Sequence, residues 1–199
     1  MLKRLIILPI FFFILSNKVA ANEHCGNNKE ARKLAQLIMQ DDKQNRKSIR
    51  CNKLLTDIAV AKASKMLEFG LVVHNLGGSP NDRLMEAGYQ LPKYYGSGFN
   101  SNQVEAIAGG YETAKDVWRG FKSSTAHRTH LLGEHEFYQE QDEIGVALVT
   151  DWHSPHVEYW VVYLTKGAEQ KQGASKEFDN IPNKGLFIIQ ASKANDSEL

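Results

Sequence analysis

The sequence predicts an α+β fold in which helices and strands occupy separate stretches of the chain. Apolar residues recur at helical spacing in residues 29–42 and 55–70, and again between residues 114 and 132. Two runs rich in β-branched and aromatic residues, 144–149 and 159–164, come later and predict an antiparallel hairpin. Helices first and strands afterwards favour segregated layers over alternating βαβ units.

The N-terminus predicts a cleavable signal peptide at residues 1–21. Lys3 and Arg4 precede an apolar run at residues 5–15, and the stretch ends in the small residues Ala20 and Ala21, which suit signal peptidase. The run is shorter than the roughly 20 residues that a membrane-spanning helix needs. We therefore expect a secreted or periplasmic protein whose mature chain has no transmembrane segment, with a retained membrane anchor as the alternative.

The charge of the mature chain argues against nucleic acid as a partner. Cleavage would remove three of the 24 Lys and Arg residues, leaving 21 against 23 Asp and Glu, so the formal net charge changes from +1 to −2. A near-neutral surface of mixed sign attracts neither nucleic acid nor an acidic membrane. The length fits one domain, which we place at residues 22–166, followed by a polar extension at 167–199 with a candidate strand at 185–190.

Two cysteines, Cys25 and Cys51, lie in the predicted mature chain. An even number of cysteines in an oxidising compartment favours a disulfide over free thiols. Such a bridge would tie the N-terminal segment to the next helix and stabilise the fold by on the order of 3–4 kcal/mol. Two buried, unpaired thiols are the alternative.

The clearest predicted helix, at residues 55–70, has Thr56 as a plausible N-cap and Gly70 as the residue that ends it. Residues 90–102 contain two glycines and show little periodicity, so we expect a long surface excursion there. The aromatic residues of this excursion are candidates for partner specificity: Tyr94, Tyr95 and Phe99.

Histidine and carboxylate side chains are the candidates for chemistry, because the sequence lacks the common nucleophile, phosphate-binding and dinucleotide-binding motifs. Glu105 lies in the apolar segment 104–108, and a carboxylate buried there needs partners. A histidine such as His74 is a natural partner, since it can carry charge or share a metal with the carboxylate. His127 and His130 lie one helical turn apart, which suits zinc, although a solvated surface pair is the alternative.

An ordered series of motifs resembles the CAP superfamily, the cysteine-rich secretory, antigen 5 and pathogenesis-related-1 proteins, in its bacterial secreted form. The resemblance covers roughly residues 29–166. Its motifs are Glu-Phe-Gly-Leu-Val-Val-His at 68–74, an arginine before an Ala-Gly-Tyr turn at 83–89, Val-Glu-Ala-Ile-Ala at 104–108, Ser-Thr-Ala-His-Arg-Thr-His-Leu-Leu at 124–132, and strand segments at 144–146 and 159–160.

The resemblance implies a three-layer α-β-α sandwich with an open cavity, which in several family members holds a divalent cation. Matching the motifs residue by residue places His74, Glu105 and His127 in this cavity, with His74 and His127 as the metal ligands, for example of zinc. Ser124 stands where many eukaryotic members have a second acid, and His130 replaces an asparagine, which offers a third imidazole. The loss of one carboxylate should weaken cation binding unless His130 turns inward.

Around the cavity glutamate, Val104 and Ala106 replace the glycine and asparagine of the family.

The resemblance favours a non-enzymatic binding domain that takes a cation or a small apolar ligand, or that meets a protein, a lipid or the cell envelope. The alternative is a hydrolase in which His127 or His74 is the general base, Glu105 orients it, and Ser124 or a metal-bound water attacks a carbonyl or glycan. A serine three residues before a histidine is more often a helix cap than a nucleophile. A third interpretation is that the polar residues only join the helices to the sheet.

Overall fold

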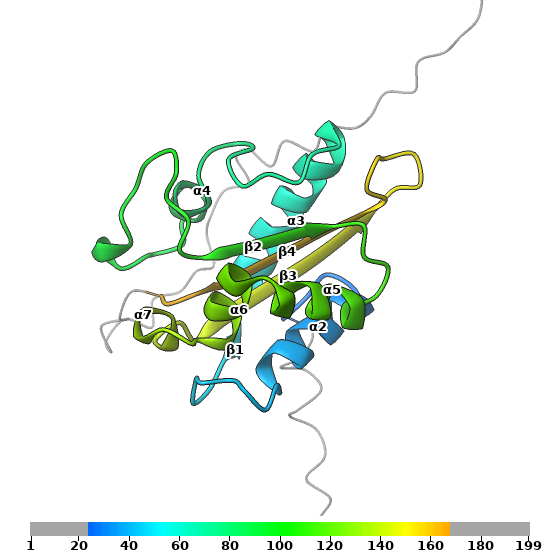
Figure 1. Ribbon diagram of the computed structural model, residues 1–199. Helices are drawn as coiled ribbons and strands as arrows, with labels where there is room; N and C mark the ends of the chain where they lie inside the picture. Colours follow the sequence, from blue (N-terminus) through cyan, green and yellow to red (C-terminus); the bar gives the residue numbers. More distant parts are fainter. Residues whose placement is uncertain (1–23, 168–199) are drawn as a thin grey trace, which may run out of the picture. The chain divides into compact units, whose positions relative to one another are not determined.

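The computed structural model describes residues 24–167 (Figure 1). The predicted signal peptide, and the predicted extension from residue 168 with its candidate strand at 185–190, lie outside the described residues. The elements follow one another as α2 (Lys29–Met39), β1 (Arg50–Cys51), α3 (Lys53–Phe69), α4 (Pro80–Glu86), the 3₁₀ helix η1 (Lys93–Tyr95), β2 (Glu105–Gly109), α5 (Ala114–Ser123), α6 (Thr125–Leu132), α7 (Glu136–Gln139), β3 (Glu143–Thr150) and β4 (Glu158–Thr165). Within residues 24–167, no helix has the length and apolar character needed to cross a membrane.

One mixed sheet of four strands, in the order β1-β3-β4-β2, forms the middle of the fold. Strands β3 and β4 pair antiparallel along their whole length, which confirms the predicted hairpin. Strand β1 runs parallel to β3, and β2 runs antiparallel to β4, so that Glu105 lies opposite Tyr163. The sheet therefore ends on one side with β2, the strand that carries Glu105.

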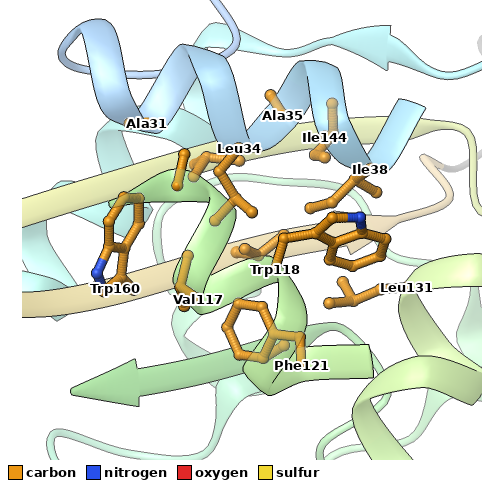
Figure 2. Close-up of a cluster of buried hydrophobic side chains, with 14 of the residues drawn as sticks. Ala31, Leu34, Ala35, Ile38, Val117, Trp118, Phe121, Leu131, Ile144 and Trp160 are labelled. Carbon is orange, nitrogen blue, oxygen red and sulfur yellow. The ribbon is translucent and has the colours of Figure 1, made fainter. Parts of the chain in front are cut away.

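Alternating side chains of the sheet build two cores, one on each face. On β4, Trp160 and its alternate neighbours pack with residues of α2, α5 and α6 (Figure 2). Tyr159, Val161 and Tyr163 point to the other face and pack with residues of α3 and α4. Helices thus cover both faces, which confirms the predicted α+β fold with three α-β-α layers.

Helix α3 begins earlier than predicted. Asn52 is its N-cap, because the Asn52 side-chain oxygen accepts a hydrogen bond from the Leu55 N–H at 3.2 Å. Thr56, the predicted cap, lies inside the helix, and its hydroxyl donates to the His24 carbonyl at 2.6 Å. The predicted end is confirmed: Gly70 takes a left-handed conformation with φ 65°.

In the excursion at residues 90–102, one of the three aromatic residues expected at the surface is buried. Tyr94 and Phe99 are exposed as expected, whereas Tyr95 is buried. The Tyr95 ring packs against Phe137 with 5.0 Å between ring centroids. Buried Asn81 holds the backbone here, since its side-chain N–H donates to the Tyr95 carbonyl at 2.9 Å. Tyr95 therefore anchors the excursion from inside.

The predicted disulfide is confirmed between Cys25 and Cys51, whose Cα atoms are 4.6 Å apart. Cys51 lies in β1 opposite Ile144, and the Cys25 carbonyl accepts a hydrogen bond from the Val146 N–H at 2.9 Å. The bridge therefore fixes the N-terminal segment and β1 to the same edge of the sheet.

We predict that the double variant Cys25→Ala, Cys51→Ala loses about 3–4 kcal/mol of unfolding free energy, because the unfolded chain regains the entropy of an open loop. Urea denaturation followed by circular dichroism measures this loss, with the reduced wild-type protein as a second reference. An unchanged denaturation midpoint would show that the bridge adds no stability.

A close approach between α3 and β3 depends on Gly145. A Cβ atom at this position would overlap the backbone of Leu55 and Thr56 in the first turn of α3. Backbone atoms cannot yield as the end of a side chain can, so the helix would have to move away from the sheet.

We predict that Gly145→Ala destabilises the protein by about 3 kcal/mol, the upper end of the cost of overpacking. Gly120→Ala is the matched comparison, because its new Cβ would meet the outer end of the Tyr111 side chain and alanine favours the helix interior. Thermal and urea unfolding should show a much smaller loss for Gly120→Ala. Equal losses would contradict this account of the helix-sheet contact.

Candidate functional site

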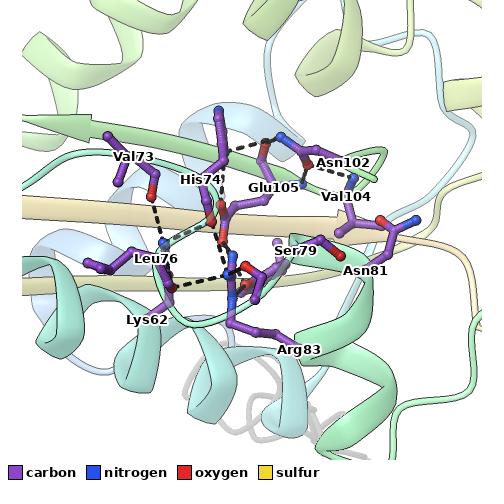
Figure 3. A network of polar contacts seen from close by, with 12 residues as sticks. Lys62, Val73, His74, Leu76, Ser79, Asn81, Arg83, Asn102, Val104 and Glu105 are labelled. Carbon is purple, nitrogen blue, oxygen red and sulfur yellow. Dashed lines mark hydrogen bonds and ion pairs between the residues drawn. The ribbon is translucent and has the colours of Figure 1, made fainter. Parts of the chain in front are cut away.

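Three segments converge beside the edge strand β2. His74 follows the end of α3, Arg83 belongs to α4, and Glu105 is the first residue of β2 (Figure 3). The Glu105 side chain has no exposed surface, and it points to the face of the sheet that α3 and α4 cover. An apolar segment therefore brings a carboxylate into the interior, as the sequence predicts.

Both carboxylate oxygens of Glu105 have hydrogen-bond partners. Its Oε1 lies 2.9 Å from His74 Nδ1, and its Oε2 accepts hydrogen bonds from Arg83 Nη2 and from the Tyr163 hydroxyl, each at 2.6 Å. Burial alone would raise the pKa of Glu105, but the hydrogen bond from His74 and the Arg83 charge outweigh it and hold the pKa below its usual value. Glu105 is therefore an anion at neutral pH.

Two cations fix the loop that carries His74. Lys62 is buried on α3, and its Nζ donates to the carbonyls of Val73, His74 and Leu76 at 2.6, 3.0 and 3.2 Å. Burial lowers the pKa of Lys62 to about 8, and the Glu105 charge opposes this. Arg83 Nη1 also donates to the His74 and Leu76 carbonyls, at 3.0 and 3.3 Å. The hydrogen bonds from Lys62 and Arg83 to these backbone carbonyls therefore fix the position of His74.

The hydrogen bonds determine which ring nitrogen of His74 carries the proton. Asn102 Oδ1 accepts from the Glu105 N–H at 3.0 Å, which leaves the Asn102 amide nitrogen 3.1 Å from His74 Nδ1. Because Glu105 is ionised and can only accept, Nδ1–H donates to Glu105 and the Asn102 contact is not a second hydrogen bond. Nε2 is then the ring nitrogen that Glu105 does not engage, on a side chain that is 37% exposed.

His127 belongs to α6, in the opposite helical layer. Its half-buried ring packs on Phe121 with 5.0 Å between ring centroids. Burial lowers the pKa of His127, and repulsion between this ring and His74 when both are protonated lowers it further. His74 and Glu105 are thus in direct contact, whereas His127 affects His74 only electrostatically. Residues 24–167 contain no group of three or more His, Cys, Asp or Glu side chains arranged for a metal ion.

His130 and Ser124 have other surroundings. His130 is buried, and its Nε2–H donates to the Leu164 carbonyl of β4 at 2.9 Å. Burial lowers the pKa of His130 to about 4, which keeps the ring neutral. Ser124 lies at the junction of α5 and α6, where its side chain makes no capping hydrogen bond to α6. His130 therefore joins α6 to the sheet.

Three residues that hold Glu105 and His74 were not predicted from the sequence. Tyr163 lies opposite Glu105, and this register appears only when β2 and β4 pair. Arg83 was visible as part of a motif, without a partner. Lys62 gave a clearer signal, because it is a lysine on the apolar face of a helix, between Ile58 and Met66. Such a lysine indicates a buried cation that needs acceptors.

A pocket of about 490 Å³ adjoins these cations between α3 and α4. Aliphatic side chains of Leu54, Ile58 and Leu76 line it, with Lys65 and Glu86 among its charged residues. Pockets of this volume with mostly apolar walls suit small ligands.

The fold and site define a three-layer α-β-α domain with a buried carboxylate that orients an accessible histidine. No protein-family model matches the chain, and no curated protein matches its sequence. Two solved structures are similar. An outer surface protein of Borrelia burgdorferi is 21% identical with a TM-score of 0.49, covering 68% of this chain and 88% of that one. An extracellular protein of Bacillus anthracis that contains an SCP domain is 20% identical with a TM-score of 0.41, covering 58% of this chain and 33% of that one.

These likenesses concern the fold alone. SCP-domain proteins belong to the class that the sequence resembles.

We predict that Glu105→Gln lowers the unfolding free energy by about 3–5 kcal/mol at neutral pH, because it leaves the buried Arg83 charge without its anion. The pKa of Glu105 is lowered in the folded state, so its stabilisation is present above the ordinary glutamate pKa of about 4.3 and is lost as the pH falls through the lower folded value. The variant should lack this part of the acid dependence.

Urea unfolding between pH 7 and pH 3 measures both effects. Glu112→Gln, at an exposed position, is the control and should behave as wild type. Parallel stability curves for Glu105→Gln and wild type below pH 5 would contradict the assignment of a depressed pKa to Glu105.

Proposed function

We propose that this chain is an exported, non-enzymatic binding module of the CAP type, in which His74 and His127 bind a ligand through neutral ring nitrogens. The observation that carries the proposal is the hydrogen bond from His74 Nδ1 to the ionised Glu105. It leaves Nε2 as the His74 ring nitrogen that Glu105 does not engage, on a side chain that is 37% exposed, and the lowered pKa of His127 favours the neutral form of the His127 ring.

A divalent cation such as zinc is the ligand that this chemistry fits best. Imidazole nitrogen is a preferred zinc ligand, and a histidine that binds zinc commonly donates its other N–H to a carboxylate. Glu105 supplies that carboxylate while remaining bound to Arg83 and Tyr163. Two imidazoles leave the remaining coordination positions to water or to groups of a ligand, so we expect binding in the micromolar range.

Export is supported by the signal peptide that the sequence predicts and by the Cys25–Cys51 disulfide, since such bonds persist in oxidising compartments. A small apolar ligand is the second candidate. The aliphatic pocket between α3 and α4 favours it, because its walls offer Leu54, Ile58 and Leu76 to a hydrocarbon group.

A hydrolase remains the competing function, and the same hydrogen bond favours it. A carboxylate that orients a histidine through Nδ1 is the arrangement of a general base. Ser124 would then have to reach His127 or His74 as the nucleophile. Turnover of ester, peptide or glycan substrates that is lost in His74→Gln would support this function over simple binding.

The test is calorimetric titration of zinc into the mature protein. We predict a micromolar dissociation constant for wild type and no measurable binding for the double variant His74→Ala, His127→Ala, because both ring nitrogens are removed. Circular dichroism checks that the double variant stays folded. The control is His153→Ala, whose ring is almost fully exposed in the β3-β4 loop and which should bind zinc as wild type does.

Equal zinc affinity in wild type and the folded double variant would refute the metal site. Absence of zinc binding by wild type would also refute it. The pocket between α3 and α4 and the exposed surface of the excursion would then be the places to examine for lipid and protein ligands.

A further inference from the structure

One stripe of α3 forms a wall of the pocket of about 490 Å³ between α3 and α4. Its residues recur every three or four positions, so they share one helix face and span about 16 Å along the helix axis. The loop after α3 and the facing side of α4 complete the pocket. The stripe consists of Leu54, Asp57, Ile58, Ala61, Lys62 and Lys65.

Three cations meet at the end of this pocket beside the loop after α3. Lys62 Nζ and Arg83 Nη1 both donate to the Leu76 carbonyl, at 3.2 and 3.3 Å (Figure 3). Lys65 lies over Gly77, because a Cβ atom on this glycine would come within 3.2 Å of Lys65 Nζ. Three positive charges therefore surround one short stretch of the loop.

The positive charge at this end exceeds the negative charge that the protein supplies. Arg83 is ion-paired with the buried Glu105 at 2.6 Å. Among the described residues, Lys62, Lys65 and Arg83 form no other ion pair. Lys62 uses its three N–H donors on backbone carbonyls, whereas Lys65 is exposed and can direct its ammonium group to a ligand. An anionic group of a ligand would therefore be stabilised at Lys65.

Helix α4 runs antiparallel to α3 along the pocket. Arg83 binds the loop that follows α3. Tyr89, just after α4, donates to Glu143, which also accepts from Asn52, the N-cap of α3. Glu86 therefore lies nearer to the start of α3 than Arg83 does.

Carboxylates line the pocket toward this second end. Glu86 is exposed and forms no ion pair among the described residues, while Asp57 is paired with Lys53 at 2.7 Å. Between the two ends the wall is apolar, with the side chains of Ile58 and Ala61 on α3. The pocket thus has a cationic end, an apolar middle and an anionic end.

This charge distribution selects a ligand that carries both charges. A neutral hydrocarbon would leave Lys65 and Glu86 without partners, and a carboxylate with a long alkyl chain would place hydrocarbon beside Glu86. A short peptide with free termini has a carboxylate, an ammonium group and apolar side chains between them. Four extended residues reach about 13 Å, which fits the length of the α3 stripe.

We propose that the pocket between α3 and α4 binds short apolar peptides with free termini, with the carboxylate at Lys65 and the ammonium group at Glu86. The inference rests on the pocket proposed above for a small apolar ligand, and it adds two charges to that ligand. It does not depend on the zinc site.

The test is calorimetric titration of the tetrapeptide Ala-Leu-Leu-Ala into the mature protein, beside its N-acetylated and C-amidated forms. We expect saturable binding of the free peptide and about tenfold weaker binding of each blocked form, because each loses one charge-assisted contact. Equal binding of the three forms, or no binding of the free peptide, would overturn the proposal. Octanoate that binds as tightly as the peptide would overturn it in favour of an amphiphilic acid.

Two variants assign the ends of the peptide. Lys65→Met should bind the free and the C-amidated peptides equally, and Glu86→Gln should bind the free and the N-acetylated peptides equally. Lys115→Met, at an exposed position on α5, is the control and should discriminate as wild type does. Unchanged discrimination by Lys65→Met and Glu86→Gln would place the charged contacts elsewhere and overturn the proposal.

A larger side chain in the apolar middle tests the location. Ala61→Trp should fill the pocket and abolish peptide binding, whereas Ser64→Trp, exposed on the same helix outside the pocket, should leave it unchanged. Circular dichroism checks the fold of both variants. Peptide binding by folded Ala61→Trp would overturn the location. Zinc titration of the same variants tests the metal site separately, since a filled pocket should leave zinc binding as in wild type.

Discussion

The ion pair between Glu105 and Arg83 is the interaction on which the rest of the site depends. It brings a carboxylate of the edge strand and a guanidinium of α4 together at 2.6 Å, with almost no solvent contact. Arg83 holds the carbonyls of the His74 loop with the same side chain, while Glu105 holds the His74 ring. One charge pair therefore orders a strand, a helix and a loop at once.

Sequence periodicity predicted the long elements that have a regular apolar pattern. Helix α3 and the β3-β4 hairpin follow from their apolar patterns. The start of α3 was misplaced because Asn52 and Thr56 are both good caps, and the choice depends on the carbonyl of His24 that Thr56 meets. Strand β2 was not recognised because it is short and begins with a charged residue. Its pairing with β4 makes it a strand.

The sequence predicted the histidine and the carboxylate of the candidate site, but not the residues that hold them in place. Glu105 and His74 meet as expected, since a buried carboxylate needs such a partner. The helical pattern indicates that Lys62 is buried, but its carbonyl partners depend on the folded loop, and the role of Tyr163 depends on the strand register. His130 shares a helix with His127, yet its ring is buried and its Nε2–H donates to the Leu164 carbonyl of β4, whereas the His127 ring is half-buried against Phe121.

For a chain exported as proposed, the disulfide has a consequence for the order of folding. In a chain that crosses a membrane from its N-terminus, Cys25 and Cys51 arrive early, 26 residues apart. Their partner strand β3 arrives much later, at Glu143–Thr150. The bridge can therefore close before the β3-β4 hairpin exists, and β1 then pairs with β3 as part of a loop that is already closed.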